Sequence, residues 1–182
     1  MAHAAVHDTH DTHDHKPQGF LHRWLFTTNH KDIGTLYLVF ALIMFFTGGS
    51  MAMIIRAELF EPGMQLVQPE FFNQMTTVHA LVMIFGAVMP AFVGLGNWMI
   101  PLQIGAPDMA LPRMNNWSFW IMPFAFTLLL TPLLLQGFGI GSGGPAGGWT
   151  LYPPLSLQSG TSTAFTIFAI HMMGVSSIMG AI

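Results

Sequence analysis

The chain has 182 residues, of which 52% are hydrophobic and only 7% are charged. Soluble domains carry about a quarter charged residues, so the composition indicates a membrane protein. The net charge of −3, with no basic patch, argues against nucleic-acid binding. The absence of cysteine excludes disulfides, thiolate zinc sites and Cys-ligated iron–sulfur clusters within this sequence.

Residues 1–19 are polar and contain the repeat HDTHDTHDH at positions 7–15. Nothing in this stretch is apolar enough to fold, so we predict a disordered N-terminal arm. His and Asp at this density can bind divalent metal loosely. A solvated tail is the favoured interpretation, because a flexible site loses ordering entropy when it binds.

A transmembrane helical domain is predicted for residues 20–182. It opens with LHRWLFTTNHKD at 21–32, whose mixture of aromatic and basic residues is typical of a segment lying at the membrane interface. Four apolar runs long enough to cross a bilayer follow, at about 33–55, 73–96, 117–136 and 163–182. Gly48, Gly49 and Ser50 give the first span a face of small residues that a neighbouring helix can approach. Because the fourth run is still apolar at Ile182, we expect this chain to be the N-terminal part of a longer polypeptide.

Positive charges set the expected orientation. Lys16, Arg23 and Lys31 precede the first span, and Arg113 lies between the second and third. The positive-inside rule therefore predicts a cytoplasmic N-terminus. Asp108 would then lie on the cytoplasmic side, and His79 about two turns below the outer surface, at a depth near Arg56.

His79 is the one ionisable residue of the second span, and hydrocarbon offers its imidazole no partner. Three interpretations remain open on the residues alone. The imidazole of His79 either forms a hydrogen bond with a neighbouring helix, or belongs to a proton relay or substrate site, or ligates a metal or haem. Met83 and Gly86, at i+4 and i+7, are expected on the same face as His79 and favour a large flat partner.

Three other groups of polar residues are candidates for function. Arg56 either snorkels to headgroups or contacts a cofactor at its depth. Asp108 is either an ordinary loop carboxylate or the mouth of a hydrated path formed by amides and hydroxyls. The amides are those of Asn97, Asn115 and Asn116 beside the loop, and the hydroxyls deeper in are those of Tyr37, Ser118, Ser176 and Ser177. Glu58, Glu61, Gly63 and Gln65 bring oxygen donors into one external loop, which is compatible with a hard cation.

Several runs of the sequence resemble subunit I of the haem–copper cytochrome c oxidases of the haem A-containing kind. The matching runs are FTTNHKDIGTLY at 26–37, IIRAEL at 54–59, TTVHALVMIFGAVMPAFVGLGNWMIPLQIGAPDMALPRMNNWSFW at 76–120, GWTLYPPLS at 148–156 and GVSSIMGAI at 174–182. They cover nearly everything after the arm, and the block at 79–120 is highly specific. The resemblance implies an all-α membrane fold, the first four helices of a twelve-helix bundle, with the chain ending within helix four.

The resemblance also implies roles for individual residues. His79 would be an axial ligand of the low-spin haem A iron, and Arg56 would contact the haem formyl group. Asp108 would open the proton-uptake path, followed by Asn97, Asn115, Tyr37, Ser118, Ser176 and Ser177. Glu58, Glu61, Gly63 and Gln65 would match an external Ca²⁺ or Na⁺ site. The second haem ligand and the haem–copper site, with its copper ligands, are expected beyond Ile182. His171 matches none of these ligands and is interpreted as packing or hydrogen bonding.

The implied function is electron transfer from cytochrome c through haem A to a haem–copper centre that reduces O₂ to water, with proton uptake and pumping. The implied partners are oxidase subunits 2 and 3, cytochrome c, O₂ and membrane lipid. The implied location is a bacterial inner membrane. The rival class is a non-enzymatic membrane protein, either a transporter whose site includes His79 or a helical assembly subunit.

Overall fold

The computed structural model describes residues 19–141 and 143–182, so the predicted arm, apart from Gly19, lies outside the described residues. Every regular element in the described part is helical, which confirms the all-α prediction. The elements are α1 (Phe20–Phe26), α2 (His30–Glu58), α3 (Pro69–Leu81), the π-helical segment η1 (Val82–Val88), α4 (Met89–Ile104), α5 (Pro112–Gly137), α6 (Leu155–Gln158) and α7 (Gly160–Ala181).

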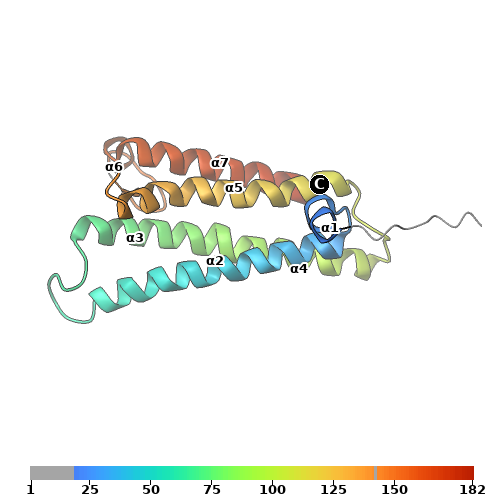
Figure 1. The fold of residues 1–182 in the computed structure, drawn as a ribbon, viewed down its shortest axis with the longest axis horizontal. Helices are drawn as coiled ribbons and strands as arrows, with labels where there is room; N and C mark the ends of the chain where they lie inside the picture. The colour runs from blue at the N-terminus through green and yellow to red at the C-terminus, as the bar shows by residue number, and fades with distance from the viewer. Residues whose placement is uncertain (1–18, 142) are drawn as a thin grey trace, which may run out of the picture.

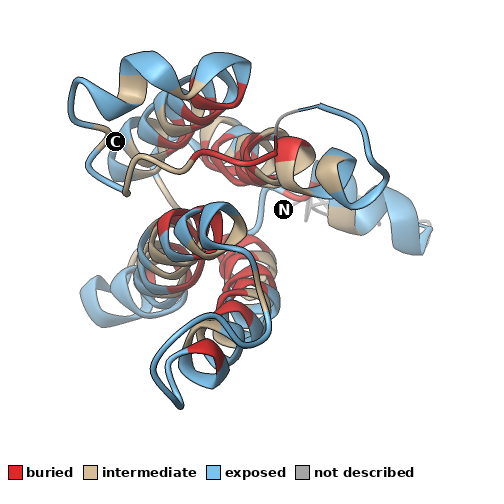
Figure 2. Ribbon diagram, turned by 90° about the vertical axis from the view of Figure 1, so that its left-hand side faces the viewer, coloured by how far each residue is buried: buried red, intermediate tan, exposed pale blue. Residues whose placement is uncertain are grey.

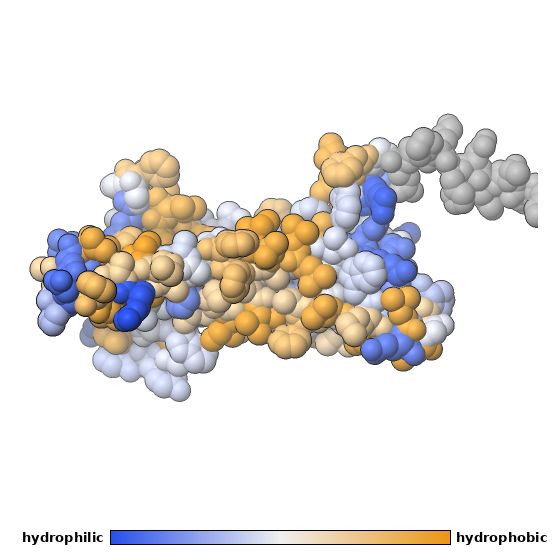
Figure 3. All heavy atoms as spheres, turned by 90° about the horizontal axis from the view of Figure 1, so that it is seen from below, coloured by the Kyte–Doolittle hydropathy of each residue, from blue (hydrophilic) through white to orange (hydrophobic). Residues whose placement is uncertain are grey.

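Four helices of the described chain are long and apolar enough to cross a membrane: His30–Glu58, Pro69–Ile104, Pro112–Gly137 and Gly160–Ala181. They confirm the four predicted spans, and each begins before the predicted start. The second runs without a break through α3, η1 and α4 for 36 residues. At 1.5 Å per residue it is about 54 Å long, so its ends extend beyond a hydrocarbon layer of about 30 Å. Figure 3 shows the matching pattern, an apolar middle between polar ends.

The spans form an elongated bundle made of two helix pairs (Figure 1). In one pair α2 packs along α3, η1 and α4, and in the other α5 packs along α7. Figure 2 shows buried residues on the faces where the helices meet and exposed residues around the outside. The largest fully buried apolar side chains come from α2, α3, η1 and α5, and are Ile33, Tyr37, Val78, Leu81, Val82, Phe126 and Leu129.

Local sequence signals fix the helix ends. The Asn29 side chain accepts a hydrogen bond of 2.8 Å from the Lys31 N–H and caps α2. Pro69 begins α3 at a position where its missing N–H would have had no helical partner. Gly105 ends α4 with a φ of 71°, the left-handed conformation that glycine adopts without steric cost.

Two glycines let the backbones of α2 and α4 touch. A Cβ on Gly34 would lie 2.9 Å from the Gly94 carbonyl oxygen, and a Cβ on Gly94 would lie 3.0 Å from the Gly34 carbonyl oxygen. The predicted small-residue face was only partly right. Gly48 meets η1, whereas a Cβ on Gly49 would find nothing within 4 Å.

The amphipathic segment before the first span forms α1 and is tied to the bundle by polar contacts. The Leu25 carbonyl accepts hydrogen bonds from Asn116 Nδ2 at 3.0 Å and from Trp120 Nε1 at 3.1 Å. Arg23 pairs with Asp32 at 2.9 Å, and this hydrogen-bonded carboxylate raises the pKa of the guanidinium. The exposed apolar side chains of α1 are compatible with the predicted position of this helix at the membrane interface.

We expect Gly94→Ala to destabilise the protein, because the added methyl would lie against the Gly34 carbonyl, which is backbone and cannot rotate away. Overpacking of this kind costs about 1–3 kcal/mol of unfolding free energy. Denaturant unfolding in detergent, followed by circular dichroism, measures the loss. The matched control is Gly96→Ala, whose methyl would make an ordinary 3.6 Å contact with Ile100. Equal stability of the two variants would contradict the prediction.

Candidate functional site

His79 projects from α3 toward α2, where its ring Nδ1 lies 2.9 Å from the Gly48 carbonyl oxygen. A carbonyl only accepts hydrogen bonds, so Nδ1 carries the proton in this contact. In the neutral imidazole Nε2 then keeps its lone pair, and no hydrogen bond joins Nε2 to any of the described residues. A neutral imidazole held in this tautomer is the form that ligates a metal or haem iron.

Arg56 lies in the last turn of α2, where its charge complements the helix dipole. It is exposed, and the described residues offer it no salt bridge. Arg56 lies eight residues beyond Gly48, the residue that His79 contacts, or about 12 Å along the helix axis. The prediction that His79 and Arg56 lie at the same depth was therefore wrong. The sequence does not show which residue of α2 lies beside His79.

Gly86 does not share the face of His79. A Cβ on Gly86 would lie 2.8 Å from the ring of Phe126 in α5 and 3.1 Å from Met44 in α2, so this glycine packs against the bundle interior. Residues at i and i+7 share a face only in a regular α-helix, whereas η1 widens the helix between His79 and Gly86. π-helical turns of this kind occur frequently at functional sites.

Five of the seven predicted proton-path residues form one hydrogen-bonded cluster between α2, α4, α5 and α7. Tyr37 Oη lies 2.8 Å from Ser118 Oγ, and Ser118 Oγ donates to the Asn115 carbonyl at 2.6 Å. Since the single Ser118 proton is used there, the Tyr37 hydroxyl is the donor to Ser118. The hydroxyl of Ser176 donates to the Ser118 carbonyl at 2.6 Å.

The amides of Asn97 and Asn115 continue this cluster toward the end of the bundle that carries α1. Asn115 Nδ2 donates to Asn97 Oδ1, and Asn97 Nδ2 donates to the Val93 carbonyl at 3.0 Å. The Oδ1 atoms of Asn115 and Asn116 are buried without a hydrogen-bond partner among the described residues. Buried acceptors of this kind are the groups that ordered water satisfies.

Asp108 lies in the loop between α4 and α5, at the same end of the bundle as α1. It is half-buried, and its Oδ1 accepts the Met109 N–H at 2.7 Å. Among the described residues no hydrogen bond links its carboxylate to Asn97 or Asn115. The structure therefore joins the amides and hydroxyls by hydrogen bonds and leaves Asp108 outside that network.

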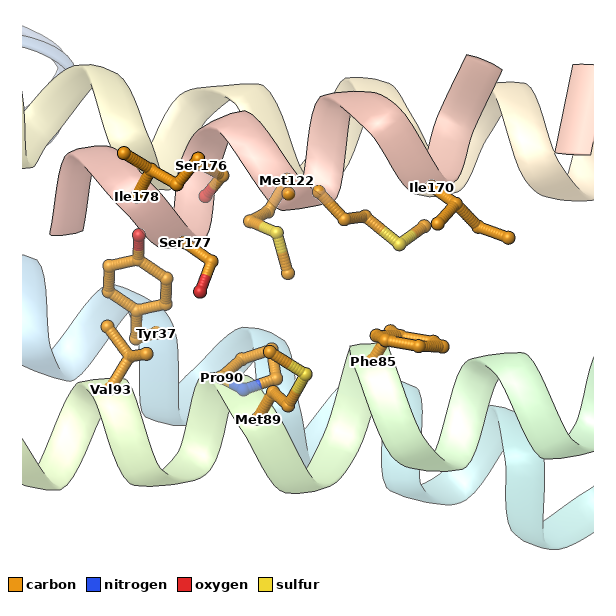
Figure 4. A pocket seen from close by; sticks show the side chains of 12 residues that line it. Tyr37, Phe85, Met89, Pro90, Val93, Met122, Ile170, Ser176, Ser177 and Ile178 are labelled. Atoms are coloured by element: carbon orange, nitrogen blue, oxygen red, sulfur yellow. The ribbon is translucent and has the colours of Figure 1, made fainter. Parts of the chain in front are cut away.

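A cavity of about 300 Å³ lies between the two helix pairs, next to the hydroxyl cluster. Tyr37, Ser176 and Ser177 line one end of it (Figure 4), which accounts for the remaining predicted residue, Ser177. Its other walls are apolar and include Phe85, Met89, Met122, Ile170 and Met173. Since a water molecule occupies about 30 Å³ in the liquid, the cavity has room for several.

The predicted cation donors lie at the opposite end, at the last residue of α2 and in the loop that follows it. Glu58 is buried, and its carboxylate accepts the backbone N–H groups of Gln65, Leu66 and Val67 at 2.9, 2.6 and 3.0 Å. These bonds use three of the roughly four acceptor positions of a carboxylate and leave one on Oε1. Glu61 and Gly63 are exposed. No group of three or more His, Asp or Glu side chains in the described chain is placed to hold a metal ion.

Two residues near these sites escaped the sequence reasoning. His30, grouped there with the interfacial residues, is buried, and its Nδ1 lies 2.8 Å from the Asn97 carbonyl oxygen. Gly48 was noted only for its size, although its carbonyl is the partner of His79. His171 agrees with its interpretation as a hydrogen-bonding residue, since its Nδ1 donates to the Ile167 carbonyl of its own helix at 2.7 Å.

Comparison with known proteins identifies the family. Residues 32–182 match the family model described as Cytochrome C and Quinol oxidase polypeptide I. The chain is 43% identical to cytochrome c oxidase subunit 1 of Cereibacter sphaeroides over 218 aligned positions, which cover all of this chain and 36% of that protein. It is 46% identical to cytochrome c oxidase subunit 1 of Mytilus edulis over 165 positions, which cover 88% of this chain and 29% of that protein. The chain thus spans about a third of the length of these relatives. On this evidence the chain belongs to the cytochrome c and quinol oxidase polypeptide I family.

Proposed function

We propose that this chain supplies the first four membrane helices of the catalytic subunit of a cytochrome c oxidase. The proposed reaction is electron transfer from cytochrome c, through low-spin haem A, to a haem–copper centre that reduces O₂ to water. The observation that carries the proposal is the imidazole of His79, fixed inside the membrane through Nδ1 with Nε2 left for a metal. The family match supports the same role.

His79 would hold haem A through Nε2, and Arg56 would contact the formyl group of the haem. The residues present fit this group, because a neutral imidazole with one nitrogen bonded to a carbonyl is the usual protein ligand of haem iron. Haem A bound there supplies a centre that takes up and passes on single electrons. The second axial ligand and the copper ligands of the family are expected from chain outside residues 1–182.

Asp108 would admit protons from the cytoplasmic side, and the amide and hydroxyl cluster would guide them inward. The hydroxyl chain runs from Tyr37 through Ser118 and ends on a carbonyl, which has no proton to pass on. Protons would therefore move through water beside the cluster. The cavity lined by Tyr37, Ser176 and Ser177 offers that space without placing a charge in the bilayer.

An external Ca²⁺ or Na⁺ site remains part of the proposal. Its donors would be the free position on Glu58 Oε1 together with oxygens of Glu61, Gly63 and Gln65. Hard cations prefer such oxygen ligands. The expected partners are oxidase subunits 2 and 3, and the expected location is a bacterial inner membrane with a cytoplasmic N-terminus.

Replacing His79 by Ala in the complete oxidase should abolish the low-spin haem A signal, because the iron loses its protein ligand. Optical and electron paramagnetic resonance spectra of the purified complex measure this. The matched control is His171→Ala, since His171 is also intramembrane but bonds its own helix. Retention of the low-spin signal in His79→Ala would reassign the ligand. A wild-type complex without a haem A band would favour the transporter or assembly-subunit alternative.

Replacing Asp108 by Asn should slow proton uptake and turnover by about 100-fold, the scale on which a positioned proton donor contributes. The haem spectrum should stay normal, because Asn can still accept the Met109 N–H. Stopped-flow proton uptake and oxygen consumption measure the change. Asp32→Asn is the control, since Asp32 is a carboxylate near the same end of the bundle that pairs with Arg23. A normal turnover rate in Asp108→Asn would remove Asp108 from the path.

Calcium should slow hydrogen exchange at the amides of Gln65, Leu66 and Val67 in the wild-type complex, because it would brace the carboxylate that holds them. The Glu58→Gln variant should exchange faster and show no calcium effect, since an amide NH₂ cannot accept from an N–H. Mass spectrometry of the exchanged complex reads this out. Equal exchange with and without calcium in the wild type would leave Glu58 as a loop anchor alone.

A further inference from the structure

We infer that Gly48 is the positioning residue for His79: its carbonyl fixes the imidazole tautomer, and its lack of a side chain lets α2 come close enough for that contact. The inference rests on the proposed role of His79 as a haem ligand. It assigns to a backbone group in the first span a part in setting the redox behaviour of the haem.

The Gly48 carbonyl oxygen lies 2.9 Å from His79 Nδ1. A hydrogen bond from Nδ1–H to a carbonyl holds the ring in one tautomer and one orientation, and raises the basicity of the opposite nitrogen. A more basic axial ligand donates more charge to the iron and favours its oxidised form. The strength of this one bond therefore adjusts the reduction potential of the haem.

The space around the Gly48 Cα is crowded by side chains of η1. A Cβ at this position would lie 2.6 Å from Met83 Sδ, 2.9 Å from Met83 Cγ and 3.3 Å from Val82 Cγ1. Both contacts below 3.0 Å are with Met83, so its side chain must move to admit a methyl, and the β-branched Val82 at 3.3 Å holds one rotamer and limits where the methyl can shift. A side chain at position 48 would thus push α2 away from η1 and α3, and the carbonyl would retreat from His79 with it.

The next residue provides the contrast. Gly49 lies in the same helix turn, and a Cβ on it would find no atom within 4 Å. Both glycines equally lower helix propensity, so propensity alone does not distinguish them. Of the two glycines, Gly48 alone lies in close contact with η1, and its carbonyl is the one that accepts the hydrogen bond from His79.

The test uses the complete oxidase with Gly48→Ala, Gly49→Ala, Met83→Ala and the double variant Gly48→Ala/Met83→Ala. The readouts are haem A content, the low-spin electron paramagnetic resonance signal and the midpoint potential of the low-spin haem. Gly48→Ala should raise the midpoint potential, because a longer Nδ1–H···O=C bond weakens charge donation by the imidazole. The midpoint potential of Gly49→Ala should match that of the wild type. The midpoint potential of the double variant should return toward that of Met83→Ala, since the shortened side chain at position 83 leaves room for the methyl at position 48.

An unchanged potential in Gly48→Ala, or an equal shift in Gly49→Ala, would overturn the inference. If Gly48→Ala fails to assemble, assembly of the double variant with haem bound supports the requirement for space at this position. Failure of both would overturn it. A wild-type complex without low-spin haem A, or an unaltered signal in His79→Ala, would instead count against the proposed function, so the two failures are distinguishable.

Discussion

The close approach of α2 to the long helix Pro69–Ile104 is the contact on which the rest of the structure depends. Near one end the backbones meet at Gly34 and Gly94, and near the other Gly48 meets Met83. Within a bilayer the hydrophobic effect does not drive helices together, so close packing and hydrogen bonds between helices supply the stability. Here the same approach also brings a carbonyl to His79 and brings His30 to the Asn97 carbonyl. The same close approach thus provides both the packing and the polar contacts of this helix pair.

The membrane spans could be predicted because length and apolarity are local properties of a sequence. The polar residues could be found for a related reason, since a lone His79 or Asn97 stands out in an apolar run. Their partners could not be predicted. The acceptor of His79 is a backbone atom of another helix, and no residue type marks a carbonyl as special. The error at Gly86 had a different cause, because the 3.6-residue period fails across the π-helical segment η1.

The polar interior of the described bundle is built almost wholly from uncharged groups. Asn97, Asn115 and Ser118 are buried and bonded, whereas Asp108 and Arg56 remain at the margins. An amide or hydroxyl in the membrane costs far less to bury than a charge, provided that its hydrogen bonds are made. A bundle of this kind can hold water between its helices without a fixed ion beside it.

The π-helical segment lets one helix serve two neighbours. His79 and Asn97 are eighteen residues apart, which is five complete α-helical turns, so a regular helix would aim both side chains in the same direction. With η1 between them, His79 bonds α2 while the Asn97 side chain bonds α5. Loss of a single residue within Val82–Val88 would turn the two ends of the helix by about 100° relative to each other. The π-helical segment thus rotates α4 relative to α3 about the helix axis. The directions in which His79 and Asn97 point depend on that rotation as well as on their spacing in the sequence.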